Sequence, residues 1–232
     1  MKTNLFVVTH KVINKKYYKD RDLFLVGPKQ DSIYKDGDFK DNTLINISDK
    51  NYTYCECTAM YWLYKNYKCD YIAIEHYRRL FYKWNFTPID KKYVEHKLKK
   101  YDFIVMINWW LTKSNKDQFI KGHGLKMYEA MENVIKKVHP EYLPSFNKVM
   151  KEHHLSWCNM LITSKTNYDK YCDFLFSILF EVEKNIEIPT DPYQRRIMGF
   201  ISERMLNVYL TYHHELKVKQ CLVLQTKRYL KE

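Results

Sequence analysis

The clearest strand signal in the chain is Asp70-Tyr71-Ile72-Ala73-Ile74-Glu75, which runs directly into His76-Tyr77-Arg78-Arg79. Its near-continuous apolar centre is typical of a strand buried on both faces, as in a parallel sheet. Similar short apolar runs occur elsewhere, and helical patterns lie between them. We predict strands at 5–8, 23–26, 70–75, 102–107 and 160–163, helices at 53–67, 91–100, 126–138, 141–153, 166–184 and 192–214, and an extended segment at 216–224. This alternation predicts an α/β fold with a mostly parallel central sheet flanked by helices.

Length and composition are those of a packed globular protein. The chain has 232 residues and is 46% hydrophobic, with only 5 glycines and 6 prolines. We find no repeat and no linker, and therefore predict a single domain over 1–232. The polar stretch 29–50 is predicted to be a long loop, which is more often functional than not. No apolar run approaches the ~20 residues of a membrane span.

The basic charge has an uneven composition. The net charge is +12, and only seven of the 39 basic residues are arginines, four of them in two adjacent pairs, Arg78-Arg79 and Arg195-Arg196. Arginine grips phosphate or carboxylate with a rigid two-bonded fork, which lysine lacks. The charge has four interpretations, namely nucleic acid, an anionic membrane surface, an anionic small substrate, or lysine-rich solubility.

Cysteine and histidine patterns predict no metal site. None of the six cysteines forms a Cys-x-x-Cys pair, and no His-Glu-x-x-His motif is present. Two Asp-x-Asp spacings, Asp20-Arg21-Asp22 and Asp36-Gly37-Asp38, are better explained as turn residues. With no signal peptide at the start, we expect free thiols and a cytoplasmic protein.

Ligands of parallel α/β sheets bind at the carboxyl ends of the strands. That rule selects Thr9-His10, His76-Tyr77-Arg78-Arg79 and Asn108-Trp109-Trp110. Two arginines at a strand end are well placed to hold a pyrophosphate. The alternative is that Arg78 and Arg79 pair with carboxylates such as Glu56 or Glu75.

The second arginine pair opens the last predicted helix, with Asp191 as its cap and Pro192 as its first residue. On this helix Arg196, Gly199 and Glu203 share one face, where the glycine leaves room for a substrate. The alternative is close helix packing at Gly199, with a local ion pair from Arg195 or Arg196 to Glu203.

Several motifs, in order and over nearly the whole chain, resemble a family of bacterial glycosyltransferases long catalogued as a domain of unknown function and found in capsule, O-antigen and exopolysaccharide loci. The most specific are His76-Tyr77-Arg78-Arg79 and Gly199-Phe200-Ile201-Ser202-Glu203. The others are Phe6-Val7-Val8-Thr9-His10-Lys11, Asn46-Ile47-Ser48-Asp49-Lys50-Asn51, Glu56-Cys57-Thr58-Ala59-Met60-Tyr61-Trp62, Asp70-Tyr71-Ile72, Asn159-Met160 and Tyr193-Gln194-Arg195-Arg196.

The resemblance implies a GT-A-like fold and transfer of a hexose from a nucleotide diphosphate donor, with UDP the expected nucleotide, to a growing glycan. Some similar proteins are linked to galactose or galactofuranose. GT-A enzymes commonly bind Mn or Mg at an Asp-x-Asp; here the arginines of the His-Tyr-Arg-Arg block could supply that charge instead, which leaves metal dependence open.

We assign roles accordingly. Glu203 is the expected general base or positioner of the acceptor hydroxyl, with Asp191 as the second candidate. Arg78 and Arg79 are expected to contact the diphosphate. The remaining donor-binding residues are expected to be Thr9, His10, Asn46, Ser48, Asn51, His76 and Tyr77, and the residues toward the acceptor or diphosphate Asn159, Gln194 and Arg196. Asn46, Ser48 and Asn51 have a second interpretation, because such side chains also shape loops and cap helices.

The partners expected are a UDP-sugar and a glycan or lipid-linked acceptor, with no nucleic acid. Lysines at 91, 92, 97, 99 and 100 predict peripheral contact with the inner face of an anionic membrane. Two other functions remain open: a basic nucleic-acid-binding module, suggested by interleaved tyrosine and lysine, and a non-catalytic sugar-binding component of a polysaccharide assembly complex.

Overall fold

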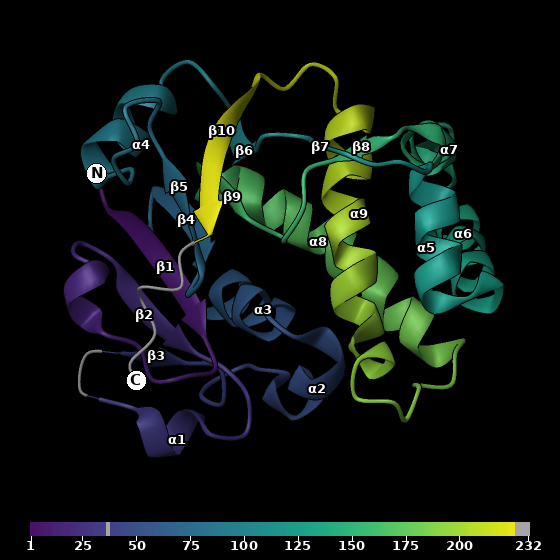
Figure 1. Ribbon diagram of the computed structural model, residues 1–232, viewed down its shortest axis with the longest axis horizontal. Helices are drawn as coiled ribbons and strands as arrows, with labels where there is room; N and C mark the ends of the chain where they lie inside the picture. The colour runs from purple at the N-terminus through teal and green to yellow at the C-terminus, as the bar shows by residue number, and fades with distance from the viewer. Residues whose placement is uncertain (36–37, 226–232) are drawn as a thin grey trace.

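The computed structural model describes residues 1–35 and 38–225 and contains an eight-stranded sheet with helices packed against it (Figure 1). The strand order is β3-β2-β1-β4-β5-β10-β6-β9. The strands are β1 (Thr3–Thr9), β2 (Asp22–Leu25), β3 (Phe39–Lys40), β4 (Tyr71–His76), β5 (Arg79–Tyr82), β6 (Phe103–Met106), β9 (Leu161–Ser164) and β10 (Val218–Gln225), and a separate pair joins β7 (Trp109–Trp110) to β8 (His154–Leu155).

Half of the sheet follows the sequence prediction and half does not. Strands β3, β2, β1 and β4 are parallel neighbours, with Val8 opposite both Phe24 and His76. Beyond β4 the sheet is mixed, because β5 and β9 both run antiparallel to β4 while β10 and β6 run parallel to each other. The expectation of a mostly parallel sheet is therefore corrected to a mixed one.

The mixed half closes on itself. Strand β9 pairs with β6 on one side and with β4 on the other, so β4, β5, β10, β6 and β9 form a ring. Because side chains alternate across a strand, each of these strands sends one residue into a shared buried cluster inside the ring. Those residues are Ala73, Phe81, Cys221, Ile104 and Ile162.

Six of the helices lie to one side of the sheet in two layers (Figure 1). The inner layer is α3 (Cys57–Asn66), α8 (Lys165–Lys184) and α9 (Ile197–Tyr212), and the outer layer is α5 (Asn115–His123), α6 (Leu125–Val138) and α7 (Leu143–Lys151). Their buried faces share the largest apolar cluster with strand residues such as Phe6, Ile72 and Phe103. On the opposite side, α4 (Lys91–Lys97) packs against β1.

Four local expectations need correction. The loop at 29–50 contains α1 (Gln30–Ile33), β3 and a 3-10 turn at Ser48–Lys50, and its Asp36 and Gly37 lie outside the described residues. The helix expected at 53–67 is split into α2 (Asn51–Tyr54) and α3. Strand β5 and helix α5 were not predicted. The last helix begins at Ile197 rather than at Pro192.

Candidate functional site

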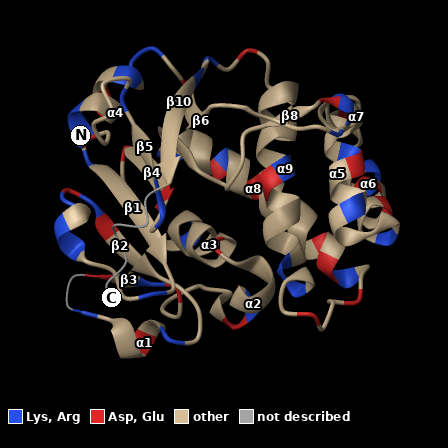
Figure 2. Cartoon of the chain, viewed as in Figure 1, with Lys and Arg blue, Asp and Glu red and all other residues tan. Residues whose placement is uncertain are grey.

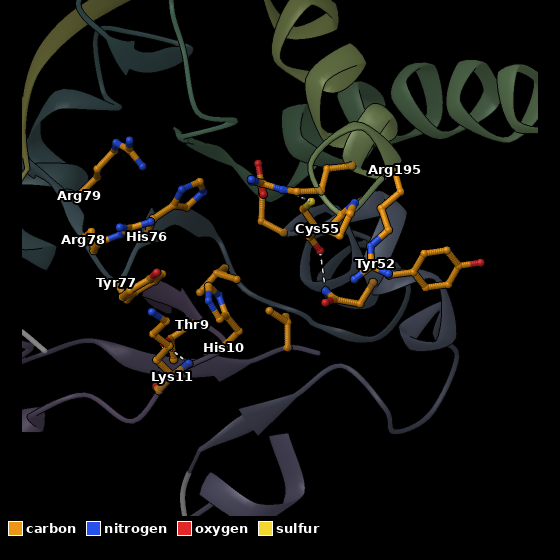
Figure 3. Close-up of a pocket in the computed structure, with 16 residues that line it drawn as sticks. Thr9, His10, Lys11, Tyr52, Cys55, His76, Tyr77, Arg78, Arg79 and Arg195 are labelled. Atoms are coloured by element: carbon orange, nitrogen blue, oxygen red, sulfur yellow. Dashed lines mark hydrogen bonds between the residues drawn. The ribbon is translucent and has the colours of Figure 1, made fainter. Parts of the chain in front are cut away.

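A polar cleft of about 440 Å³ opens where the parallel half of the sheet ends (Figure 3). One wall is formed by the end of β1 and the tight hairpin between β4 and β5, and the other by α2 and the turn before α9. Figure 3 shows Thr9, Tyr77 and Arg78 on the first wall, and Tyr52, Cys55 and Arg195 on the second. The lining residues are Val8, Thr9, His10, Lys11, Val26, Asn51, Tyr52, Cys55, Glu56, His76, Tyr77, Arg78, Arg79, Pro192, Arg195 and Arg196.

The cleft gathers positive charge. Four of the chain's seven arginines line it together with Lys11, against the single carboxylate of Glu56. Arg78 and Arg79 form no ion pair with any described residue. Glu75, the expected alternative partner, is fully buried and binds Arg21 instead, with 2.6 Å from Nε to Oε2. The arginine charge of the hairpin is therefore available to an anion.

Aromatic rings and a neutral thiol hold the arginines in place. The Arg78 guanidinium lies 5.1 Å from the centre of the Tyr77 ring, and its buried Nε has no hydrogen-bond partner in the described chain. Arg195 lies over Tyr52 at 5.9 Å. The Nε of Arg196 donates to Sγ of Cys55 at 3.3 Å, and burial raises the pKa of that thiol to about 11. None of these contacts neutralises a guanidinium, so its charge stays directed at the cleft.

The pKa values of the two cleft histidines are lowered, which favours their neutral form. Burial lowers the pKa of His76. It also lowers the pKa of His10, where the positive charges of Lys11, Arg78 and Arg196 act in the same direction. The His10 ring meets Tyr77 edge to face at 5.2 Å between ring centres. Neutral imidazoles can donate or accept a hydrogen bond without adding charge, which suits recognition of a polar ligand group.

A backbone break at Cys55 positions Glu56. Cys55 has φ 52° and ψ −128°, a conformation that side chains rarely adopt and that costs on the order of 1–3 kcal/mol. Asn51 stabilises the break because its Nδ2 donates to the Cys55 carbonyl at 2.8 Å and to Oγ1 of Thr58 at 3.0 Å. Gly199 of α9 lies beneath it, where a Cβ would come within 3.3 Å of the Cys55 sulfur. The break ends α2 and places Glu56 on the cleft wall.

Glu56 is part of a buried polar network that reaches α9. Its Oε1 accepts from Nδ2 of Asn159 at 2.7 Å, and the same amide donates to Oγ of Ser202 at 2.7 Å. No hydrogen bond within the described chain engages Oε2 of Glu56. Asn159 and its neighbour Cys158 both have positive φ, at 50° and 76°. Strained residues of this kind cluster at functional sites.

Glu203 lies behind this network and does not line the cleft. Its Oε1 accepts from the backbone N–H of Cys158 at 3.2 Å, and its Oε2 faces Nη1 of the buried Arg204 at 3.4 Å. Burial raises the pKa of Glu203 to about 7, and the negative charge of Glu56 contributes in the same direction. The ion pair from Arg195 or Arg196 to Glu203 that the sequence left open is not formed.

The raised pKa of Glu203 makes stability depend on pH. The folded chain keeps a proton that the unfolded chain releases above its ordinary pKa of 4.5, so stability falls as pH rises from about 4.5 to about 7. The loss is on the order of 3 kcal/mol for a shift of this size. Glu203→Gln should remove this contribution. Urea unfolding of both proteins at pH 5 and pH 7.5 checks it; an identical pH dependence in the two would contradict the assignment.

The other predicted site residues have defined structural contacts. Oδ1 of Asn46 accepts from the N–H and hydroxyl of Ser48, so the two shape the loop before α2, as their second interpretation expected. Asn159 supports Glu56 from below. Gln194 contacts His123 and the Gly122 carbonyl, each at 2.9 Å. The carboxylate of the exposed Asp191 accepts from the backbone N–H groups of residues 193 and 194 and caps the 3-10 turn Gln194–Arg196. The structure places none of these five in the cleft lining.

Thr9 and Asn51 line the cleft, but their side chains are also engaged. Oγ1 of Thr9 donates to the Lys11 carbonyl at 2.9 Å and holds the turn after β1. Asn51 packs against Gly27, which has φ 85° and where a Cβ would lie 2.9 Å from Oδ1 of Asn51. The structure also adds lining residues that were not predicted as site residues, namely Lys11, Tyr52, Cys55 and Glu56.

The cleft residues alone offer few ligands to a divalent metal. Within the described ranges, no three histidine, cysteine or acidic side chains lie close enough together to hold a metal by themselves. In the cleft itself, one carboxylate faces five cationic side chains, so a Mn or Mg ion there would depend on phosphate oxygens of a bound ligand. The Asp-x-Asp candidates lie elsewhere, where Asp22 accepts from Asn4 at 2.8 Å and Asp38 pairs with Lys15 at 2.6 Å.

Comparisons with known proteins agree with the fold. No curated protein matches the chain. A solved structure described as the apo form of WbbM, a bifunctional glycosyltransferase, matches with a TM-score of 0.85 and 26% sequence identity. The match covers 99% of this chain but 46% of WbbM, so the chain spans about half the length of that protein. Over residues 4–215 the sequence matches a family model, and the chain belongs to the family described as "Domain of unknown function (DUF4422)".

Proposed function

We propose that this protein is a glycosyltransferase that moves a hexose from a nucleotide-diphosphate sugar to a glycan acceptor. The observation that carries the proposal is the cleft itself, where four arginines that form no ion pair within the described chain face one carboxylate at the carboxyl ends of parallel strands. The similarity to a glycosyltransferase structure supports it. The parallel half of the sheet, with its ligand cleft at the strand ends, supports a GT-A-type donor site.

The donor is expected to bind with its diphosphate between the two arginine pairs. Arg78 and Arg79 belong to the hairpin, and Arg195 and Arg196 belong to the turn before α9. Guanidinium forks match phosphate oxygens with two parallel hydrogen bonds. The nucleoside is expected on the side of Thr9 and His10, where Val8, Val26 and the Tyr77 ring offer apolar surface. Uracil remains the expected base, and galactose or galactofuranose the first sugars to test.

Glu56 is the group best placed for the chemistry. The bond from the anomeric carbon to the diphosphate oxygen breaks, and its electron pair stays on the diphosphate, where the arginines stabilise the added charge. The acceptor oxygen bonds to the anomeric carbon, and its proton passes to Oε2 of Glu56. Asn159 fixes the other oxygen of this carboxylate. In this proposal Glu203 supports Glu56 from behind, and Asp191 has a capping role.

Nucleotide binding tests the proposal directly. At a UDP concentration of about 100 Kd, the folded state should gain ~2.7 kcal/mol, which raises Tm by roughly 5–10 °C for a chain of this length. UMP should bind more weakly because it lacks the second phosphate.

Three outcomes separate the candidate functions. A single-stranded oligonucleotide that stabilises the protein more than UDP favours the nucleic-acid-binding module. UDP binding without slow hydrolysis or transfer from any UDP-sugar favours the non-catalytic sugar-binding component. No response to UDP, to GDP or to their sugar conjugates contradicts the proposed function.

A further inference from the structure

An exposed aromatic turn lies between β5 and α4. The turn holds Trp84 and Phe86, whose exposed fractions are 71% and 68%. It is ordered by its backbone, because the N–H of Lys83 donates to the Thr87 carbonyl at 2.8 Å and Tyr82 forms a bridge with Pro88. A turn with fixed geometry thus presents two large aromatic side chains to the surroundings. Burial of these two rings on a partner would recover a large hydrophobic free energy.

Basic residues follow this turn in the chain. Figure 2 shows them along α4 and on the segment that follows it. The lysines are Lys91, Lys92, Lys97, Lys99 and Lys100. The first two begin α4, Lys97 ends it, and the other two follow it. None of the five forms an ion pair with a carboxylate of the described chain. Lys83 and Lys97 lie over the same Tyr93 ring, at 5.6 and 5.5 Å, which joins the turn to the helix.

Two nearby acidic groups, Asp90 and Glu95, offset only part of this charge. Asp90 caps α4 through the N–H of Tyr93 and pairs with Lys83 at 2.5 Å. Glu95 accepts the hydroxyl proton of Thr3 at 2.7 Å. The surface formed by Trp84, Phe86 and these lysines is therefore both aromatic and positive. We call it the Trp84 surface.

We propose that the Trp84 surface docks the protein onto an anionic lipid bilayer, with Trp84 and Phe86 at the level of the headgroups and the lysines above the lipid phosphates. Tryptophan is favoured at membrane–water interfaces, and each lysine near an anionic surface adds attraction that salt weakens. The surface contains lysine and no arginine, whereas four of the chain's seven arginines line the cleft. No described helix is long and apolar enough to cross a membrane, so this contact would be peripheral.

The docking surface and the cleft lie at opposite ends of one strand. Strand β5 begins at Arg79 in the cleft and ends at Tyr82, next to the aromatic turn. Docking would therefore leave the cleft open. The protein could bind nucleotide without binding vesicles, or bind vesicles without binding nucleotide. The membrane proposal and the proposed function are therefore tested independently.

Vesicle co-sedimentation of the full chain tests the inference. The vesicles contain phosphatidylcholine with or without phosphatidylglycerol, at low ionic strength. The protein should bind the anionic vesicles and not the neutral ones. Replacing Lys92, Lys99 and Lys100 by Gln should weaken binding on the order of a hundredfold. The matched control replaces three other exposed lysines by Gln, namely Lys113 before α5, Lys121 on α5 and Lys126 on α6. This variant should bind the anionic vesicles within about threefold of the original chain.

Fluorescence locates the inserted ring. The emission should shift to shorter wavelength on binding, and Trp84→Phe should bind while losing this shift. Trp84→Ser with Phe86→Ser should lose most binding, whereas Trp109→Ser with Trp110→Ser, which removes two other exposed tryptophans, should not. The inference is overturned if anionic vesicles do not retain the protein, if both lysine triples have equal effects, or if the shift survives in Trp84→Phe.

Discussion

Glu56→Gln is expected to reduce turnover by a factor on the order of 10² to 10³ while UDP affinity stays within about twofold. Glutamine keeps the shape of the side chain and its contact with Asn159 but cannot take up a proton from the acceptor hydroxyl. General-base catalysis by a positioned carboxylate contributes a factor of this order. Separate measurement of UDP affinity and of kcat for sugar transfer or slow donor hydrolysis checks the result.

Glu203→Gln serves as the comparison for Glu56. Glu203 lies outside the cleft lining, so its replacement should change turnover less than Glu56→Gln and should mainly alter the pH dependence of stability. Near-normal turnover in a folded Glu56→Gln protein, together with a large loss in Glu203→Gln, would return the proton-accepting role to Glu203. Asp191→Asn should leave turnover nearly unchanged because Asp191 caps a turn.

Removal of both hairpin arginines is expected to have the largest effect of all. Each charge-assisted hydrogen bond contributes about 1.5–3 kcal/mol, so Arg78→Ala with Arg79→Ala should lower kcat/KM by a factor on the order of 10⁴ and weaken UDP binding. The fold should survive because neither guanidinium forms an ion pair with a described residue. Calorimetric titration with UDP and a transfer assay measure the two effects.

Single lysine variants refine this prediction. Arg78→Lys and Arg79→Lys keep the charge but lose the fork, so each should weaken turnover by about tenfold. Arg21→Lys is the matched control, because Arg21 is paired with Glu75 and does not line the cleft. It should reduce stability without a specific loss of UDP affinity. Full activity in both hairpin lysine variants would remove the two arginines from the donor site.

The parallel half of the fold could be predicted from the sequence for a physical reason. Strands such as 5–8 and 70–75 are buried on both faces, so they stand out as apolar runs bounded by polar residues. Since the carboxyl ends of parallel neighbours meet at one edge, the sequence alone was enough to place Thr9, His10 and the His76–Arg79 segment together. The structure brings these residues into one cleft, whereas Asn108-Trp109-Trp110, which the same rule selected, does not line it.

The mixed half could not be predicted, because strand direction depends on contacts far apart in sequence. Segment 160–163 was expected as a strand, but nothing in it shows that β9 runs antiparallel to both β4 and β6. Strand β5 was missed because the turn before it, Tyr77-Arg78, contains none of the glycine or asparagine residues that mark most two-residue hairpins.

Glu56 was missed for a related reason. Residues 53–67 have a continuous helical pattern, and no glycine or proline marks the break at Cys55. The break depends on a local hydrogen bond from Asn51, four residues before it, and on close packing against Gly199, which lies far along the chain. On an unbroken helix, Glu56 would be one more polar surface residue. The role we propose for it rests on its position in the cleft with the arginines, which only the fold shows.

The position of β10 has a consequence for how the protein is made. This strand is the last described element, yet it lies between β5 and β6, and its Gln225 is the partner of Arg79. During synthesis the hairpin leaves the ribosome well over a hundred residues before the strand that supports it. Contacts of such large sequence separation form late. A nascent chain that has already folded its helices still lacks the strand that pairs with β5, so this wall of the cleft is completed only after β10 has left the ribosome.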